Sequence, residues 1–335
     1  MVNACIIGCG LIAPVHLKAI SSIENGNVYG VCDTDKERAD LFAKEYNAKA
    51  FYSLDDVLCD ENVDVVHICT PHYLHADMAI KALEKGKNIV LEKPCAINDI
   101  EFEKLIASYK NSNKKVCSVF QNRTNTCIEM LKDITNSNSD DGKLLGISGT
   151  MRWSRDADYY NHDEWRGKYA TEGGGALINQ SIHLLDLMLL FGGKVESVCA
   201  SHSNKSLKDV IEVEDTIDAL INFESGIRGS FYATNSYPVN QPFQLELNFE
   251  NATYRYADNN LYKIVKGECT FICRNGATVP GKDYWGGGHK RVISDFYNAI
   301  LNGTEYIDLT SAVHTTKTML AIYKSAKNKG DVTKP

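Results

Sequence analysis

The chain has 335 residues, of which 44% are hydrophobic and 24% charged, and its formal net charge is −7. This length allows two domains, the composition is typical of a soluble globular protein, and the negative charge argues against binding to nucleic acid or an anionic membrane. No apolar run approaches 18 residues, which argues against a membrane span. The eleven cysteines are scattered and no signal sequence is recognisable, so we expect a cytoplasmic protein with reduced thiols.

The N-terminal segment predicts a dinucleotide-binding turn. Residues 2–7 read as a buried parallel strand, and Gly8-Cys9-Gly10-Leu11-Ile12-Ala13 follows it and opens a helical pattern. In this fingerprint the first glycine allows a tight turn, the second lets a pyrophosphate approach the backbone, and the alanine allows close packing. The N–H groups at Leu11 and Ile12 would then face the phosphates. A glycine-rich turn without a ligand is the alternative.

Asp33 predicts which dinucleotide binds. Residues 27–32 form the expected second strand, and Asp33 ends it, 23 positions after Gly10. A carboxylate there accepts hydrogen bonds from both ribose hydroxyls of NAD and repels the 2′-phosphate of NADP. Asp35 adds to that repulsion, and Arg38 is the one nearby feature that favours a phosphate. We therefore predict NAD, with NADP less favoured; the alternative role for Asp33 is an N-cap of the next helix.

Strands and helices alternate as far as residue 120. We expect further strands at 64–69, 88–91 and 115–120, and helices at 36–46, 73–85 and 98–111. Such alternation is typical of βαβ units and predicts an α/β fold with a doubly wound parallel sheet, a Rossmann domain over residues 1–121.

The pattern changes beyond residue 121. Most segments of residues 143–266 alternate in hydrophobicity as half-buried strands do, and residues 244–250 do so most clearly. A long apolar helix at 175–191 interrupts them, and helices at 287–302 and 310–328 close the chain. We expect a second, α+β domain over residues 122–335.

The motif Glu92-Lys93-Pro94 is the first candidate for chemistry. It lies at the carboxyl end of a predicted strand, where open α/β sheets place their ligands. Pro94 stiffens the turn and would aim the Lys93 side chain. An ion pair of Lys93 with Glu92 or another acid is the alternative.

The apolar helix at 175–191 carries the second candidate. Asn179, His183 and Asp186 follow one another at i, i+4 and i+7, which forms a polar stripe without Lys or Glu. Buried polar groups need partners, and a substrate hydroxyl is one such partner. A core network in which Asp186 orients His183 is the alternative.

Other clusters give weaker signals. Cys69, His72 and His75 lack a fourth metal ligand, and Cys269 and Cys273 lack a second pair, so we expect no metal site. An aromatic cluster with a cation suits a sugar ring, a core or an interface; it consists of Trp153, Arg155, Tyr159, Tyr160 and Trp165.

Taken together, these motifs resemble those of the glucose-fructose oxidoreductase/inositol dehydrogenase (Gfo/Idh/MocA) family. The matching stretches are Gly8–Ala13, Thr70–His75, Glu92–Pro94, Trp165–Gly167 and Gly173–Asp186. The resemblance implies that the second domain has an open, mostly antiparallel sheet, through which members form homodimers or homotetramers. It also implies NAD(P)-dependent oxidation or reduction at a secondary alcohol of a sugar, cyclitol or sugar derivative.

The resemblance implies roles for individual residues. Lys93 corresponds to the catalytic lysine and His183 to the catalytic histidine, and the Lys93–Pro94 bond is expected to be cis. Thr70, Pro71 and His75 are expected to lie along the cofactor.

Two further sets of contacts complete the expected site. We add Glu92 and Lys93 to the cofactor contacts, and for the substrate we expect Arg123, Arg155, Tyr160, Trp165, Asn179 and His183.

The proton acceptor is open at this point. Many members have Asp where this chain has Asn179, so Lys93 or His183 could take the hydroxyl proton while Asn179 orients the substrate or His183. Two other functions are alternatives: an NAD-dependent glycosidase that uses transient oxidation, and a non-catalytic regulator that senses dinucleotide.

Overall fold

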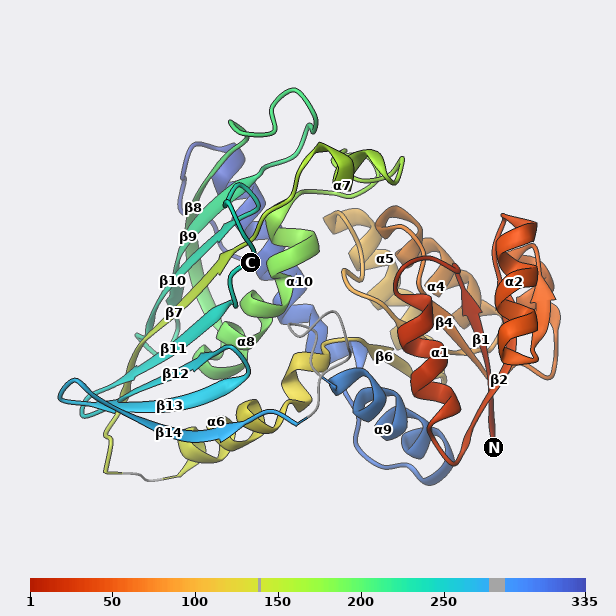
Figure 1. Ribbon diagram of the computed structural model, residues 1–335, viewed down its shortest axis with the longest axis horizontal. Coiled ribbons are helices and arrows are strands. Elements are labelled where there is room, and N and C mark those ends of the chain that lie inside the picture. The colour runs from red at the N-terminus through yellow and green to blue at the C-terminus, as the bar shows by residue number, and fades with distance from the viewer. Residues whose placement is uncertain (138–139, 277–286) are drawn as a thin grey trace. The chain divides into compact units, whose positions relative to one another are not determined.

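The computed structural model describes residues 1–137, 140–276 and 287–335, which form two compact units (Figure 1). The first unit contains Met1–Phe120 and His289–Ala312, and the second contains Gln121–Gly288 and Val313–Pro335. No helix among the described residues is both long and apolar enough to cross a bilayer.

The first unit is built on a six-stranded sheet in which every pairing is parallel. Its strands are β1 (Val2–Ile7), β2 (Gly26–Cys32), β3 (Lys49–Phe51), β4 (Val65–Ile68), β5 (Asn88–Leu91) and β6 (Val116–Ser118). The order β3-β2-β1-β4-β5-β6 reverses direction between β1 and β4. This confirms the predicted doubly wound sheet. In such sheets a ligand binds at the carboxyl ends of the two strands where the order reverses, which are β1 and β4 here.

Helices alternate with these strands along the chain. They are α1 (Ala13–Ser21), α2 (Lys36–Tyr46), α3 (Leu54–Cys59), the short η1 (His72–Leu74), α4 (His75–Glu84) and α5 (Asp99–Lys110). Asp35 is the N-cap of α2, because its Oδ1 accepts the N–H of Arg38 at 3.1 Å. This leaves Asp33 outside that capping role.

From His289 on, helix α9 (Gly288–Asn302) belongs to the first unit, although the sequence-based division placed its residues in the second domain. Its apolar face buries Val292, Ile293, Phe296 and Tyr297 in the same core as β1 and α1. The apolar pattern predicted the helix correctly but does not specify which sheet it covers.

The second unit contains an eight-stranded sheet, ordered β14-β13-β12-β11-β7-β10-β9-β8. Its strands are β7 (Leu144–Arg152), β8 (Val195–Ser203), β9 (Thr216–Phe223), β10 (Arg228–Thr234), β11 (Gln244–Phe249), β12 (Thr253–Ala257), β13 (Asn260–Val265) and β14 (Glu268–Arg274). Among these strands β7 and β10 pair in parallel and the other pairings are antiparallel, which confirms the expected mostly antiparallel sheet.

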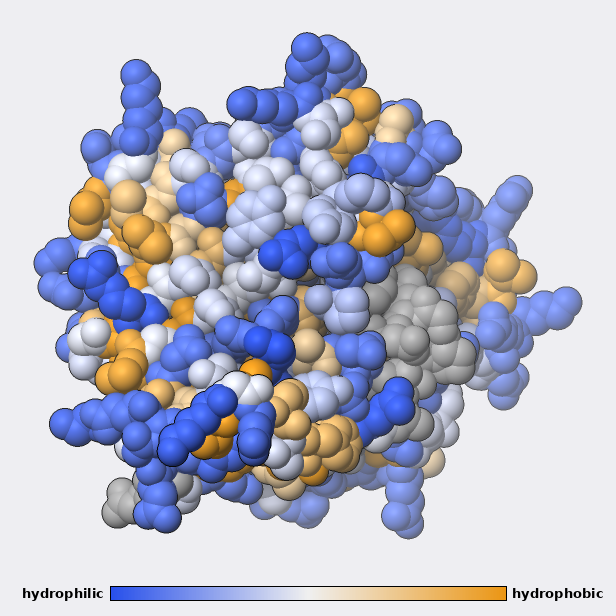
Figure 2. Space-filling model, turned by 60° about the vertical axis from the view of Figure 1, so that its left-hand side comes forward, coloured by the Kyte–Doolittle hydropathy of each residue, from blue (hydrophilic) through white to orange (hydrophobic). Residues whose placement is uncertain are grey.

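One face of this sheet packs against helix α8 (Ile182–Gly192) (Figure 1). A Cβ on Gly149 of β7 would collide with Met188, so this glycine allows the close approach of α8. The opposite face carries exposed cross-strand pairs such as Leu220 with Ser230. Figure 2, turned toward the side of Figure 1 where this sheet lies, shows hydrophobic and hydrophilic side chains mixed on the surface.

The predicted helix at 175–191 is two segments. It begins as the π-helix η3 (Ala176–Ser181) and continues as α8. Helices η2 (Gln121–Thr124), α6 (Thr126–Asn136), α7 (Ala157–Asn161) and α10 (Leu309–Lys327) complete the described elements. Because π-helical turns occur frequently at functional sites, η3 directs attention to Asn179.

Candidate active site

The glycine turn of the first unit has the shape that a dinucleotide requires. Gly8 has φ +92°, and a Cβ there would lie 2.8 Å from the carbonyl oxygen of Cys69. A Cβ on Gly10 would meet no atom within 4 Å, so the turn is open on that side. The residues therefore fit a bound pyrophosphate at the start of α1.

Asp33 is held beside this turn. Its Oδ2 accepts the N–H of Cys9 at 2.9 Å, and its Oδ1 accepts the N–H of Asp35 at 2.9 Å. Arg38, whose side chain is 50% exposed, lies 3.7 Å from Asp33 and 3.4 Å from Asp35. The carboxylate thus has a fixed direction at the end of β2, as ribose recognition requires.

His75 joins the two loops that follow β4 and β5. Its Nδ1 lies 2.7 Å from the carbonyl oxygen of Pro94, and its Nε2 lies 2.8 Å from that of Thr70. The ring is buried, and this burial lowers the pKa of His75. A neutral ring has one N–H, so His75 donates to one of these two carbonyl oxygens and links the loop at Thr70 to the loop at Pro94.

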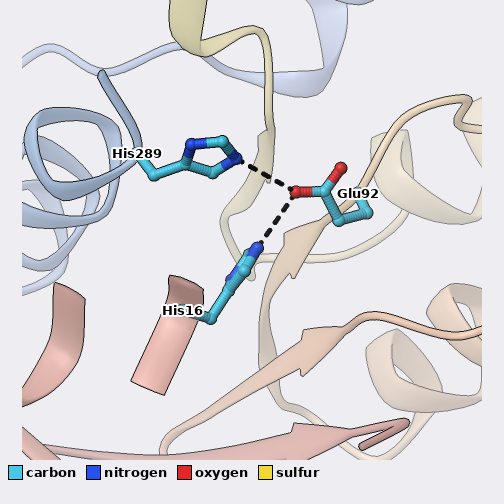
Figure 3. Close-up of side chains that lie close together, drawn as sticks. All are labelled: His16, Glu92 and His289. Carbon is cyan, nitrogen blue, oxygen red and sulfur yellow. Dashed lines mark hydrogen bonds and ion pairs between the residues drawn. The ribbon is translucent and has the colours of Figure 1, made fainter. Parts of the chain in front are cut away.

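Glu92, the residue before Lys93, lies in a buried cluster with His16 and His289 (Figure 3). Glu92 Oε1 contacts His16 Nε2 at 3.0 Å and lies 3.7 Å from His289 Nε2, while Glu92 Oε2 accepts the N–H of Lys93 at 3.2 Å. Burial alone would raise the pKa of Glu92, but hydrogen bonds from the two histidines hold it well below its usual range. Glu92 was expected to contact the cofactor, but in the structure both of its carboxylate oxygens contact protein groups.

The cluster continues into the core through two hydrogen bonds. His16 Nδ1 lies 2.9 Å from His67 Nδ1, and His67 Nε2 lies 2.8 Å from the hydroxyl of Tyr297. One proton arrangement satisfies the whole chain with neutral rings: Tyr297 donates to His67, His67 donates to His16, and His16 donates to Glu92. Burial lowers the pKa of His67, which agrees with a neutral ring.

His16, Glu92 and His289 also have the composition of a metal site. Their ligand atoms lie within 4.8 Å of one another, and they form the one such group among the described residues. The 3.0 Å contact between His16 and Glu92 is that of a direct hydrogen bond, which explains the cluster without an ion. The sequence pattern did not predict these histidines, because a lone histidine in an apolar stretch carries no functional signal.

In the second unit, Asn179 and His183 stand out by their exposure. Every other residue of the segment 174–189, all of which the structure describes, is buried, whereas these two are half-buried. The segment therefore presents two half-buried polar side chains from an otherwise buried stretch. This supports the predicted stripe at its first two positions.

Asp186, the third residue of the stripe, has other partners. Its Oδ2 accepts Nε of Arg123 at 2.8 Å, and its Oδ1 accepts Nη2 of Arg123 at 2.5 Å and the hydroxyl of Thr315 at 2.7 Å. Arg123, an expected substrate contact, is thus engaged in a buried bidentate ion pair that joins η2 to α8.

Glu172 is a site residue that the motif analysis missed. It is fully buried; its Oε1 accepts Nδ2 of Asn179 at 2.5 Å, and its Oε2 accepts the N–H of Gly167 at 2.5 Å. Burial raises the pKa of Glu172 to about 7, although both hydrogen bonds lower it. Its position immediately before Gly173-Gly174-Gly175 was the available signal.

A second buried carboxyl, Glu214, holds the start of η3. It accepts the N–H groups of Gly175 at 2.8 Å and Leu177 at 3.1 Å, and the hydroxyl of Tyr323 at 2.9 Å. These bonds satisfy first-turn N–H groups that lack a helical partner.

The aromatic cluster divides between core and surface. Tyr160 is buried against Leu207 and Ile211, and its hydroxyl accepts Nδ2 of Asn235 at 3.0 Å. The guanidinium of Arg155 lies 5.0 Å from the ring of Trp153.

A cavity of about 370 Å³ lies beside this cluster. Its lining residues include Tyr160, Asp163, Arg166, Gly167, Lys208 and Ile211. Trp165 packs under Arg166, at 4.5 Å.

Comparison with known proteins agrees with this architecture. Residues 2–121 match the family described as "Oxidoreductase family, NAD-binding Rossmann fold", and residues 137–255 match the "GFO/IDH/MocA C-terminal domain". The Lys93–Pro94 bond is cis, as the resemblance implied.

Curated relatives are similar to this chain at moderate identity. Trans-1,2-dihydrobenzene-1,2-diol dehydrogenase of Mus musculus is 26% identical over 68% of this chain and 66% of its own length, slightly less than two thirds. Glucose-6-phosphate 3-dehydrogenase of Bacillus subtilis is 25% identical over 78% of this chain and 77% of its own.

A solved structure resembles the whole chain. The WlbA dehydrogenase from Bordetella pertussis, in complex with NADH and UDP-GlcNAcA, has a TM-score of 0.86 and 26% identity over 100% of this chain and 98% of that one. The match to an NAD-binding Rossmann fold confirms the predicted NAD cofactor, and the shape of the glycine turn is compatible with it. The chain therefore belongs to the Gfo/Idh/MocA family of NAD-binding oxidoreductases.

Proposed function

We propose that the protein is a dehydrogenase that transfers a hydride between NAD and a secondary alcohol or ketone of a sugar, cyclitol or sugar derivative. The observation that carries this proposal is the exposure of Asn179 and His183 from an otherwise buried segment. Partly exposed polar side chains can hydrogen-bond a hydroxyl-bearing ligand. The names of the relatives, which specify a sugar phosphate and a cyclic diol, support the same substrate class.

The first unit would hold the cofactor. The N–H groups at Leu11 and Ile12 would face the pyrophosphate, Asp33 would accept the adenosine ribose hydroxyls, and Thr70 and Pro71 would form a wall. When bound, NAD supplies the hydride acceptor.

Two residues are the proposed proton acceptors. Lys93, at the carboxyl end of β5, or His183, on α8, takes the hydroxyl proton, and Lys93 stabilises negative charge that develops on the oxygen. Asn179 hydrogen-bonds the substrate. Glu92 acts through the Lys93 backbone N–H that it accepts.

The secondary substrate contacts are a separate part of the proposal. Arg155 and Trp165 would bind the sugar. Tyr160, which lies in the core, and Arg123, which pairs with Asp186, would act by shaping the site.

A substrate panel tests the proposal. Aldoses, sugar phosphates, nucleotide sugars and cyclitols are incubated with NAD or NADP, and NADH absorbance is recorded for the wild type and for Lys93→Met as the matched control. We expect at least one sugar or cyclitol to be oxidised by the wild type. Tight NAD binding with no oxidation of the panel would contradict the proposal, and cleavage of an aryl glycoside without added NAD would favour the glycosidase alternative.

A further inference from the structure

Glu172, which is buried, and Asn179, which is half-buried, form a hydrogen-bonded pair. The Glu172 carboxyl is fully buried, and the N–H of Gly167 occupies its Oε2 while Nδ2 of Asn179 occupies its Oε1, both at 2.5 Å. Asn179 itself is half-buried, so it links the buried carboxyl to the outer surface of η3.

The ionised form of Glu172 fixes the direction of the Asn179 amide. A carboxylate can only accept hydrogen bonds, so the Nδ2 group must face it and the Oδ1 group must point the other way. The carbonyl end of the amide then acts as an acceptor on the outer side.

The protonated form allows the opposite arrangement. A neutral carboxyl has an O–H that can donate to Oδ1 of Asn179, and the amide then points its Nδ2 group outward. One proton on Glu172 thus exchanges an acceptor for a donor at the outer end of Asn179.

Several charged or titratable groups face Glu172 from the neighbouring elements. Arg166, between α7 and η3, favours the ionised form, whereas Glu214, which precedes β9, opposes it. Tyr160 of α7 and Tyr323 of α10 are close enough for Glu172 to raise the pKa of each, although burial is the largest cause of both shifts. Burial raises the pKa of Glu172 itself to about 7, so both of its forms are populated near neutral pH.

We propose that Glu172 is a positioning residue that decides whether Asn179 offers the substrate a hydrogen-bond acceptor or a donor. This rests on the proposed function, because it takes Asn179 as the partner of the reacting oxygen. An alcohol donates its hydroxyl proton to an acceptor, whereas a ketone can only accept from a donor. Ionised Glu172 therefore favours binding of the alcohol, and protonated Glu172 favours binding of the ketone.

The first test needs no substrate. The Asn179 side-chain signal is identified in the ¹⁵N amide spectrum of the cofactor-free wild type by its absence from the spectrum of Asn179→Asp. In the wild type, the chemical shift of this signal should titrate with a midpoint near pH 7. The midpoint should disappear in Glu172→Gln and persist in Glu224→Gln, which changes an exposed carboxyl in the turn after β9. An Asn179 signal that does not respond between pH 5 and 9 in the wild type would overturn the proposal, whether or not any sugar is oxidised.

The second test uses the reversed pair. With a sugar from the panel, kcat/KM of oxidation by the wild type should fall as the pH drops below about 7, and Glu172→Gln should remove this acidic limb of the profile. The double variant Glu172→Gln/Asn179→Asp should be at least tenfold faster than Glu172→Gln without restoring that limb. The double variant keeps one carboxylate and one amide in contact, so a merely structural role predicts the same pH profile throughout. An unchanged limb in Glu172→Gln would overturn the proposal while leaving the dehydrogenase assignment intact.

Discussion

At the scale of single residues, Asn179 is the position where the structure changes an expectation. Many members of the family have Asp here, and a carboxylate beside a histidine raises the pKa of that histidine. In the structure, the side chain at 179 faces the Glu172 carboxyl at 2.5 Å. Two carboxylates that close cannot both ionise, so one of them would keep a proton with a raised pKa.

We therefore predict that Asn179→Asp alone lowers oxidation at neutral pH by roughly tenfold and moves the acidic limb of its pH profile upward. Combination with Glu172→Gln should restore the rate at neutral pH and move the acidic limb below the neutral range, because only one carboxylate then remains in the pair. The measurement is kcat/KM against pH for the three variants. A single variant as active as the wild type at pH 7 would show that the two side chains do not interact in solution.

Asp33 is the residue that sets cofactor preference. Its carboxylate is oriented by the N–H groups of Cys9 and Asp35 beside the glycine turn. We predict tighter binding of NADH than of NADPH, and a smaller difference in Asp33→Ser, because the negative charge that repels the 2′-phosphate is removed. Calorimetric titration with both nucleotides measures this, and equal affinities in the wild type would contradict it.

At the scale of elements, the buried cluster joins α1, α9 and the end of β5. Of the two histidines that face Glu92, His16 lies closer, at 3.0 Å. Removing the partner of a buried carboxylate strongly destabilises the folded protein, because the charge is then left uncompensated. We predict that His16→Ala lowers the free energy of unfolding by about 3 kcal/mol at neutral pH. His202→Ala, which changes an exposed residue of β8, should alter it by less than about 0.5 kcal/mol.

The same contact has a predicted dependence on pH. The pKa of Glu92 is lowered in the fold, so its stabilising effect is present above its unfolded value of about 4.3 and is lost as pH falls through the lower folded value. The difference between wild type and His16→Ala should therefore shrink in acid. Denaturant titrations at several pH values measure it, and a difference independent of pH would contradict the assignment of charge to Glu92.

Sequence patterns predicted the elements better than their packing. The strands at 2–7, 27–32 and 88–91 and the helix at 36–46 were predicted within one residue. The strand Lys49–Phe51 was missed, since three residues are too few to show a period. The π-turn at 176–181 was also missed: it depends on Glu214, which lies far along the chain and accepts the N–H groups of Gly175 and Leu177.

The sequence predicted some residues of the candidate site and missed others. The glycine turn, Asp33, Lys93, Asn179 and His183 stood in recognisable motifs. Glu172, His16 and His289 did not, because their importance comes from burial and from partners in other elements.

At the scale of the whole molecule, we expect a homo-oligomer. The surface that Figure 2 shows mixes hydrophobic side chains with polar ones. On the face of the eight-stranded sheet opposite α8, Leu220 and Tyr232 are 55% and 37% exposed. A second copy could cover such a face. Light scattering should show a mass above the 37.2 kDa of one chain, and Leu220→Glu should lower it. A wild-type monomer at micromolar concentration would contradict this expectation.

The most direct test of the central claim compares turnover and cofactor binding in Lys93→Met and His183→Ala. Loss of general acid–base catalysis typically lowers a rate by 10²–10⁴-fold, or about 3–5 kcal/mol. With a sugar or cyclitol that the wild type oxidises, we predict that each variant loses kcat by roughly that factor while the Kd for NADH stays within about threefold of the wild-type value. Retention of wild-type kcat by both variants would contradict the account, because neither residue would then take the proton.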